Sequence, residues 1–281
     1  MLAALIIVFR EVVEAGLIVG IVLAATRGVP GRALAITGGV GGGVIGACLV
    51  AAFADGIANL FAGSGQELLN VAVLGIAVLM LGWHNIWMAR HGRQMAAEMQ
   101  AVGAAVRTGS RSLGTLAIVV GVAVLREGSE VVLFLYGVSA SGGSSAAGII
   151  GGGALGIALG GVVAALMYLG LVRIPARRLF AVTSGLIALL AAGMAAQAAQ
   201  FLQQAGIVSA LSRPLWDTSW VLADDSIGGR VLHTLVGYTD QPDGLQLLAY
   251  LATLAIIIGL MKLFGTTTPA HRPANGRPAR A

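Results

Sequence analysis

Charged side chains and cysteines are scarce in this chain. Only 10% of its 281 residues are Asp, Glu, Lys or Arg, whereas soluble domains carry about 25%. Because Cys48 is the sole cysteine, the chain can form neither an internal disulfide nor a metal cluster held by several thiolates. Its four histidines supply no helix with the paired ligands that haem requires. These absences disfavour a soluble domain and a haem-bearing redox subunit.

What the chain has in abundance is apolar sequence. Hydrophobic residues make up 57% of it, and the mean hydropathy is +0.90. The 42 glycines fall inside apolar runs, as in membrane helices that pack backbone to backbone. The net charge of +5 lies mostly in short connections, which favours a role in membrane orientation over nucleic-acid binding. The composition predicts an all-α integral membrane protein whose surroundings are a lipid bilayer.

Seven apolar runs are each long enough for a membrane-spanning helix, which needs about 20 residues. The first contains charges and has no basic start, so we interpret it as a retained span and not a signal peptide. Basic residues gather after the first, third and fifth spans and in the tail, which places the N-terminus outside and the C-terminus inside. The predicted spans are 2–25, 33–54, 68–89, 113–137, 146–171, 178–202 and 246–264.

A five-residue string occurs twice inside these spans. Arg10-Glu11-Val12-Val13-Glu14 lies in the first span and Arg126-Glu127-Gly128-Ser129-Glu130 in the fourth, so both read R-E-x-x-E. Charged side chains in the hydrocarbon core cost several kcal/mol unless they are paired or face water. An intramembrane charged cluster therefore indicates a functional site, and here the cluster is doubled.

The doubled string also divides the chain into repeats. Arg126 follows Arg10 by 116 residues, and glycine strings in the second and fifth spans match at a distance of 110. A three-span unit that occurs twice has opposite orientations in the membrane, as in many transporters. We predict one domain over 1–264, followed by a disordered cytoplasmic tail over 265–281. Its parts are repeat one (1–90), a basic connection or interfacial helix (91–109), repeat two (113–203), an outer loop (204–245) and an extra seventh helix (246–264).

Helical spacing gives the doubled string its chemistry. Residues three and four apart share one face of a helix, so each string presents Arg and two Glu within about 100°. If the faces oppose each other, Glu11, Glu14, Glu127 and Glu130 meet Arg10 and Arg126 with a formal charge of minus two. Oxygen ligands favour hard ions such as ferric iron, calcium, magnesium or manganese. The arginines are expected to act as counter-charges that make the empty site tolerable. The alternative is that each Arg/Glu pair only stabilises its own helix as an intrahelical ion pair and has no ligand role.

The two strings resemble the signature of the oxidase-dependent iron permease family, which includes the EfeU-type bacterial permeases and the fungal high-affinity iron permeases. The second string is close to the family's R-E-G-L-E form, and the first departs from it at Val12. The resemblance extends to the segment Leu215-Trp216-Asp217-Thr218-Ser219 and to Gly237-Tyr238 before Pro242. It implies a permease, not an enzyme, that imports ferric iron across the cytoplasmic membrane. The motif glutamates would be the ligands, and a partner protein outside would oxidise the iron.

Other polar residues rank below the motifs. Asp55 and Glu67 flank an outward connection and could attract cations, although solvated loop acids are the commoner case. We interpret His84 as part of an aromatic belt with Trp83 and Trp87, with an exit-path ligand as the alternative. Ser129 is a further candidate oxygen. No cofactor is expected beyond the transported ion, and the alternatives left open are a permease for lead, manganese or ferrous iron and an iron sensor that moves nothing.

Overall fold

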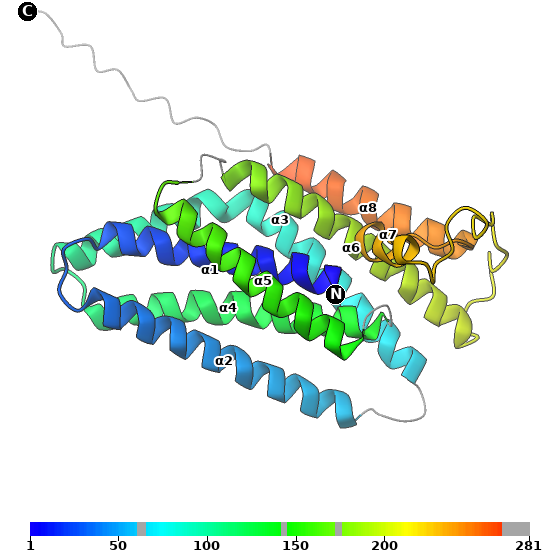
Figure 1. Ribbon diagram of the computed structural model, residues 1–281, viewed down its shortest axis with the longest axis horizontal. Coiled ribbons are helices and arrows are strands. Elements are labelled where there is room, and N and C mark those ends of the chain that lie inside the picture. The colour runs from blue at the N-terminus through cyan, green and yellow to red at the C-terminus, as the bar shows by residue number, and fades with distance from the viewer. Residues whose placement is uncertain (61–65, 142–144, 172–175, 266–281) are drawn as a thin grey trace, which may run out of the picture.

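The chain folds into long α-helices, shown in Figure 1. The computed structural model describes residues 1–60, 66–141, 145–171 and 176–265, and within these ranges the only β-pairing is an isolated bridge between Pro214 and Asp243. The helices are α1 (Leu2–Ala25), α2 (Arg32–Leu60), α3 (Gln66–Arg107), α4 (Leu113–Ala140), α5 (Ala146–Tyr168), α6 (Ala176–Gln204), α7 (Ile227–Val236) and α8 (Gly244–Gly265).

Several of these helices are suited to a bilayer. Long apolar stretches in α2, α3, α5, α6 and α8 are sufficient to cross a membrane. Helices α1 and α4, with 24 and 28 residues, are long enough as well, but each carries the three charged residues of its motif. The prediction of an all-helical, multi-pass membrane protein is confirmed.

The two motif helices lie inside the bundle and run in opposite directions (Figure 1). Helix α1 packs mainly on α5, and α4 packs mainly on α2. Helix α3 contacts both motif helices and pairs with α6, which in turn packs against α8. The connections α1–α2 and α3–α4 meet at one end of the bundle, and the segment from α6 through α7 to α8 lies at the other. This arrangement leaves α1, α4 and α3 as the helices that enclose the centre.

Glycine brings both motif helices close to their neighbours in the same way. A Cβ added at Gly156 of α5 would lie 2.8 Å from Val8 Cβ, and one added at Gly43 of α2 would lie 2.7 Å from Val124 Cβ. Val124 follows Val8 by 116 residues, the distance that separates the motifs. The contacts therefore equate Gly43 with Gly156, three residues beyond the glycine match read from the sequence. Two glycine-rich runs can be aligned in several registers. Only the register that pairs Gly43 with Gly156 places both glycines at equivalent contacts with a motif helix.

Two predicted boundaries differ from the structure. Helix α3 continues for 42 residues to Arg107, so most of the predicted connection 91–109 belongs to it. This stretch is rich in Ala and free of Pro, which favours helix, and its Val106 packs with Val22 and Leu116. The predicted outer loop contains α7, which begins after a Ser226 cap and ends at Gly237 with φ of 69°. The predicted disordered tail lies almost wholly outside the described residues.

Candidate metal centre

The two R-E-x-x-E motifs meet at the centre of the bundle, where α3 covers them. The first motif is wholly enclosed: Arg10, Glu11 and Glu14 are all buried. Glu127 of the second motif is 2% exposed, while the Glu130 side chain is 14% exposed. Side chains three and four apart on α1 and α4 point the same way, as the spacing predicts. The structure thus brings together the four carboxylates that the sequence singled out.

Each arginine pairs with the last glutamate of its own motif. Arg10 Nε lies 2.9 Å from Glu14 Oε1, and Arg126 Nε lies 3.1 Å from Glu130 Oε1. Arg10 Nη1 also reaches Glu11 Oε1 at 3.4 Å. In each motif the contact occupies one oxygen of the last glutamate and leaves the other directed elsewhere. The arginines therefore hold carboxylates in place without using up all their oxygens.

The remaining donor atoms converge in two overlapping groups. One donor atom each from Glu11, Glu14 and His84 lie within 4.8 Å of one another, and the same holds for Glu11, Glu127 and Glu130. Neither oxygen of Glu127 has a hydrogen-bond partner among the described residues, nor has Glu11 Oε2 or Glu14 Oε2. Buried polar atoms are nearly always bonded, so such a concentration of unbonded oxygens calls for a ligand. Glu11 is common to both groups and occupies the middle of the cluster.

The formal charge of the cluster indicates which kind of ligand would balance it. Four carboxylates and two guanidinium groups leave a formal charge of minus two. Burying uncompensated charge is costly, and the cost rises when the oxygens also lack hydrogen-bond donors. A divalent cation cancels the formal charge and supplies the missing partner for the oxygens. The site is chemically suited to bind a metal cation.

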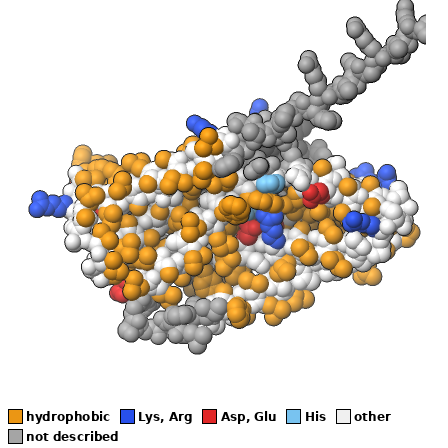
Figure 2. All heavy atoms as spheres, turned by 180° about the vertical axis from the view of Figure 1, so that it is seen from behind, with side chains coloured by type: hydrophobic (Ala, Val, Ile, Leu, Met, Phe, Trp, Pro, Cys, Tyr) orange, Lys and Arg blue, Asp and Glu red, His pale blue; other side chains and the backbone are white. Residues whose placement is uncertain are grey.

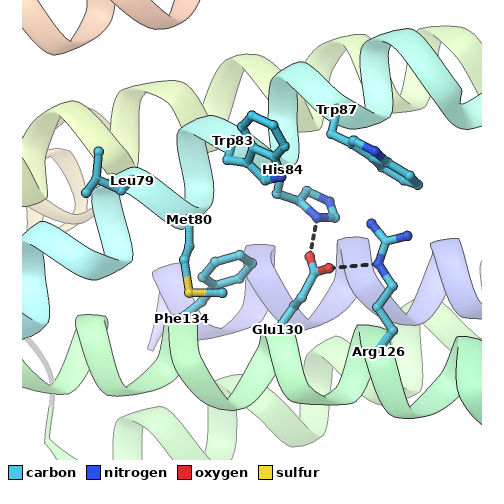
Figure 3. A pocket seen from close by; sticks show the side chains of 8 residues that line it. All are labelled: Leu79, Met80, Trp83, His84, Trp87, Arg126, Glu130 and Phe134. Carbon is cyan, nitrogen blue, oxygen red and sulfur yellow. Dashed lines mark hydrogen bonds and ion pairs between the residues drawn. The ribbon is translucent and has the colours of Figure 1, made fainter.

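His84 belongs to this cluster and not to an interfacial belt. Its side chain is 4% exposed, and its ring points from α3 toward Glu130, which its Nδ1 contacts (Figure 3). The neighbouring Trp83 is 70% exposed. The Arg126 guanidinium lies over the Trp87 ring, with its Cζ 4.0 Å from the ring centroid. The sequence contained one signal for this placement, a His-Asn pair inside an apolar run, but it did not show which face of α3 meets the motifs.

Asn85, the second residue of that pair, has a packing role that the sequence did not reveal. It is buried, and its Nδ2 donates to the Ser184 carbonyl oxygen on α6 at 3.1 Å. This bond joins α3 to α6 directly beside His84. Asn85 therefore helps to fix the rotation of α3 that turns His84 toward the carboxylates.

A cleft leads to the cluster between α3 and α4. It has a volume of about 610 Å³ and exposes 34% of the Arg126 side chain, compared with 1% for Arg10. Figure 2 shows charged side chains and a histidine at the surface near the middle of a face that is mostly hydrophobic or uncharged around them. The second motif is therefore the accessible side of the site. The cleft is lined by Leu79, Met80, Trp83, His84, Trp87, Arg126, Glu130 and Phe134.

Two lower-ranked residues, Ser129 and Glu67, do not join the cluster in the structure. The Ser129 hydroxyl donates to the Leu125 carbonyl oxygen at 2.7 Å, so it stabilises its own helix. Glu67 is exposed in the first turn of α3. Asp55 lies on α2, but its side chain is outside the described residues.

The acidic residues of the α6–α8 segment mainly hold that segment together. Asp217 accepts from the Ser219 amide at 2.9 Å, and Asp224 accepts from the Asp240 amide at 3.1 Å. Burial, together with the carboxylate of Asp240, raises the pKa of Asp224. These contacts show that the two aspartates stabilise the turns of this segment.

Comparison with known proteins identifies relatives along most of the chain. The model of the iron permease FTR1 family matches residues 1–268. A protein named ferrous iron permease EfeU from Escherichia coli O6:H1 is 32% identical over 253 residues, which cover 86% of this chain and 88% of that protein. The protein of the same name from Shigella sonnei is 31% identical over 253 residues, which again cover 86% of this chain and 88% of that protein. No solved structure matches the chain.

Proposed function

Because this chain belongs to the iron permease FTR1 family, we propose that it imports iron through the buried carboxylate centre formed by its two motifs. The observation that carries the proposal is the set of unbonded oxygens on Glu11, Glu14 and Glu127 at the centre of a membrane protein. In this proposal the protein acts as a transporter for the ion and not as an enzyme. Glu11, Glu14, Glu127 and Glu130 act as ligands, and Arg10 and Arg126 balance the charge when no ion is bound.

The proposed topology has seven spans. Helices α1 to α6 and α8 cross the cytoplasmic membrane, with the N-terminus outside, the C-terminus inside and α7 in the outer segment. Helices α1–α3 and α4–α6 form two inverted copies. Support comes from the opposite directions of α1 and α4 (Figure 1) and from the equivalent contacts of Gly43 and Gly156. Movement of one copy against the other would expose the centre to each side in turn.

Two oxidation states of iron are candidates. Ferric iron, delivered by an oxidising partner outside, is what the resemblance implies, and carboxylate oxygens suit it. Ferrous iron is favoured by the formal charge of minus two and by the imidazole of His84 in the cluster. The name of the relatives points the same way, since it describes them as ferrous iron permeases.

Uptake into proteoliposomes that contain only this protein tests the proposal. The wild-type chain should accumulate iron, and comparison of ferrous with ferric iron identifies the species carried. Glu14→Ala and Glu130→Ala should abolish uptake while the protein still inserts. Glu67→Ala is the matched control, because Glu67 is an exposed glutamate outside the cluster, and it should transport normally. Unimpaired uptake by Glu14→Ala would refute the assignment of the motif glutamates.

A further inference from the structure

We propose that His84 is a metal ligand of this centre, and that it donates its Nε2 nitrogen to an ion held by Glu11 and Glu14. The inference rests on the proposed cation site. The motifs alone supply only oxygen ligands, and His84 adds a nitrogen ligand to them. It changes the class of ion that the site selects.

The positions of the ring nitrogens carry the first step. His84 Nε2 lies 3.6 Å from Glu14 Oε2 and 3.9 Å from Glu11 Oε2. Both distances are too long for hydrogen bonds, and Nε2 has no such partner among the described residues. Two ligands bound at about 2.1 Å to one ion are separated by about 3 Å when adjacent and about 4.2 Å when opposite. The two distances from Nε2 fall between these values, and one donor atom from each of the three residues lies within 4.8 Å of the others, so one ion can be within reach of all three side chains.

The second step concerns the other ring nitrogen. Nδ1 contacts Glu130 Oε2, while Glu130 Oε1 is paired with Arg126 Nε at 3.1 Å. Figure 3 shows this row of three side chains from α3 to α4. Histidines that bind metals commonly donate the second ring N–H to a carboxylate, which fixes the tautomer and the ring. With the proton on Nδ1, the lone pair of Nε2 is directed at Glu11 and Glu14.

The third step is burial. His84 and the first motif are almost fully enclosed, so water cannot satisfy Nε2 or the carboxylate oxygens that face it. A histidine whose only role was to hold Glu130 would need just one ring nitrogen. The second nitrogen faces the Oε2 atoms of Glu11 and Glu14, which have no hydrogen-bond partner among the described residues, and an ion between them satisfies all three atoms.

The consequence is a mixed donor set. Imidazole suits iron, zinc, nickel and copper, whereas carboxylate and water suit magnesium, calcium and manganese. A centre with His84 as a ligand favours ferrous iron over the magnesium and calcium that are far more abundant in cells. Loss of the imidazole should therefore weaken binding of ferrous iron by about tenfold or more and leave magnesium binding nearly unchanged.

Pulsed electron paramagnetic resonance of bound Mn²⁺ tests the assignment. The full chain, without an added histidine tag, is labelled with ¹⁵N only at histidine. Wild type should show hyperfine coupling between Mn²⁺ and ¹⁵N, and His84→Gln should lose it. The matched control is His91→Gln, two helical turns further along α3, which should keep the coupling.

A second variant protects the test against misfolding of His84→Gln. The combined change His91→Gln, His233→Gln and His271→Gln leaves His84 as the one remaining histidine. It should retain the coupling. Bound Mn²⁺ without ¹⁵N coupling in this variant would overturn the ligand role of His84 and leave the carboxylate site intact. Failure of the wild-type chain to bind Mn²⁺, Fe²⁺ or Fe³⁺ at all would instead overturn the proposed cation site and this inference with it.

Discussion

Arg10 and Arg126 occupy equivalent places in the two motifs but different environments. The Arg10 side chain is 1% exposed and its charge is balanced only by buried glutamates. The Arg126 side chain is 34% exposed, opens onto the cleft and stacks on Trp87. Removing one partner of a buried ion pair costs about 3–5 kcal/mol, whereas an exposed pair contributes about 0–1 kcal/mol. The two arginines are therefore unequal contributors to stability.

This difference predicts unequal effects of the same substitution. Arg10→Met should lower the thermal unfolding midpoint of the detergent-solubilised protein strongly, because it leaves Glu11 and Glu14 buried without their counter-charge. Arg126→Met should lower it much less, because Glu130 is less deeply buried and keeps its contact with His84 Nδ1. Scanning calorimetry on the two variants, each without added metal, provides the measurement. Equal shifts in the two midpoints would contradict the assigned difference in burial.

The residues of the centre also show how much of the site could be predicted from the sequence. The four glutamates were predictable, because helical spacing fixes the face on which each motif lies. His84 was not, because its role depends on the rotation of α3, which Asn85 and the packing of α3 on α6 determine. Trp83 and Trp87 also favoured an interfacial interpretation. The ligand role of the glutamates stays a prediction, whereas membership of the family is confirmed.

At the scale of helices, close contact at glycine positions the motifs. Gly156 lies where a side chain would meet Val8 of α1, two residues before the first motif. Gly161, on the same helix, has nothing within 4 Å of an added Cβ. A side chain can therefore be added to α5 either against α1 or away from it.

The pair supplies a matched experiment. Gly156→Val should destabilise the protein by about 1–3 kcal/mol, because overpacking at a helix contact forces the backbones apart. It should also reduce iron uptake, since α1 carries Glu11 and Glu14. Gly161→Val adds the same side chain and should leave stability and uptake close to wild type. Thermal unfolding in detergent and uptake into proteoliposomes measure both effects; similar behaviour of the two variants would count against the α1–α5 contact.

Helix boundaries were predictable where apolar composition changed sharply. The first span was predicted over 2–25, and α1 covers Leu2–Ala25. The third span was predicted over 68–89, which agrees with the apolar stretch Glu67–Met88 of α3. The helix itself continues to Arg107 through the predicted connection or interfacial helix, where Val106 packs with Val22. Hydropathy identifies where a chain leaves the bilayer, and a helix can continue past that point. Helix α7, with only ten residues, is too short for hydropathy to identify it as a span.

For the whole molecule, the central question is whether the two motifs form one centre or two. The structure brings Glu11 into both donor groups, and the formal charge of minus two matches one divalent ion. In the proposed inverted arrangement, one centre between the two halves would open to either side as the halves move. Two independent centres, one on each motif helix, would have no such coupling to the movement.

The most direct test is the stoichiometry of ferrous iron bound under anaerobic conditions, measured by equilibrium dialysis on the purified chain. The account predicts one ion per chain, with affinity lost in Glu14→Gln and equally in Glu127→Gln, although each variant alters only one motif. Combining the two changes should cost little more than the more severe single change. Two ions per chain, with each single variant losing one and retaining the other, would contradict the shared centre.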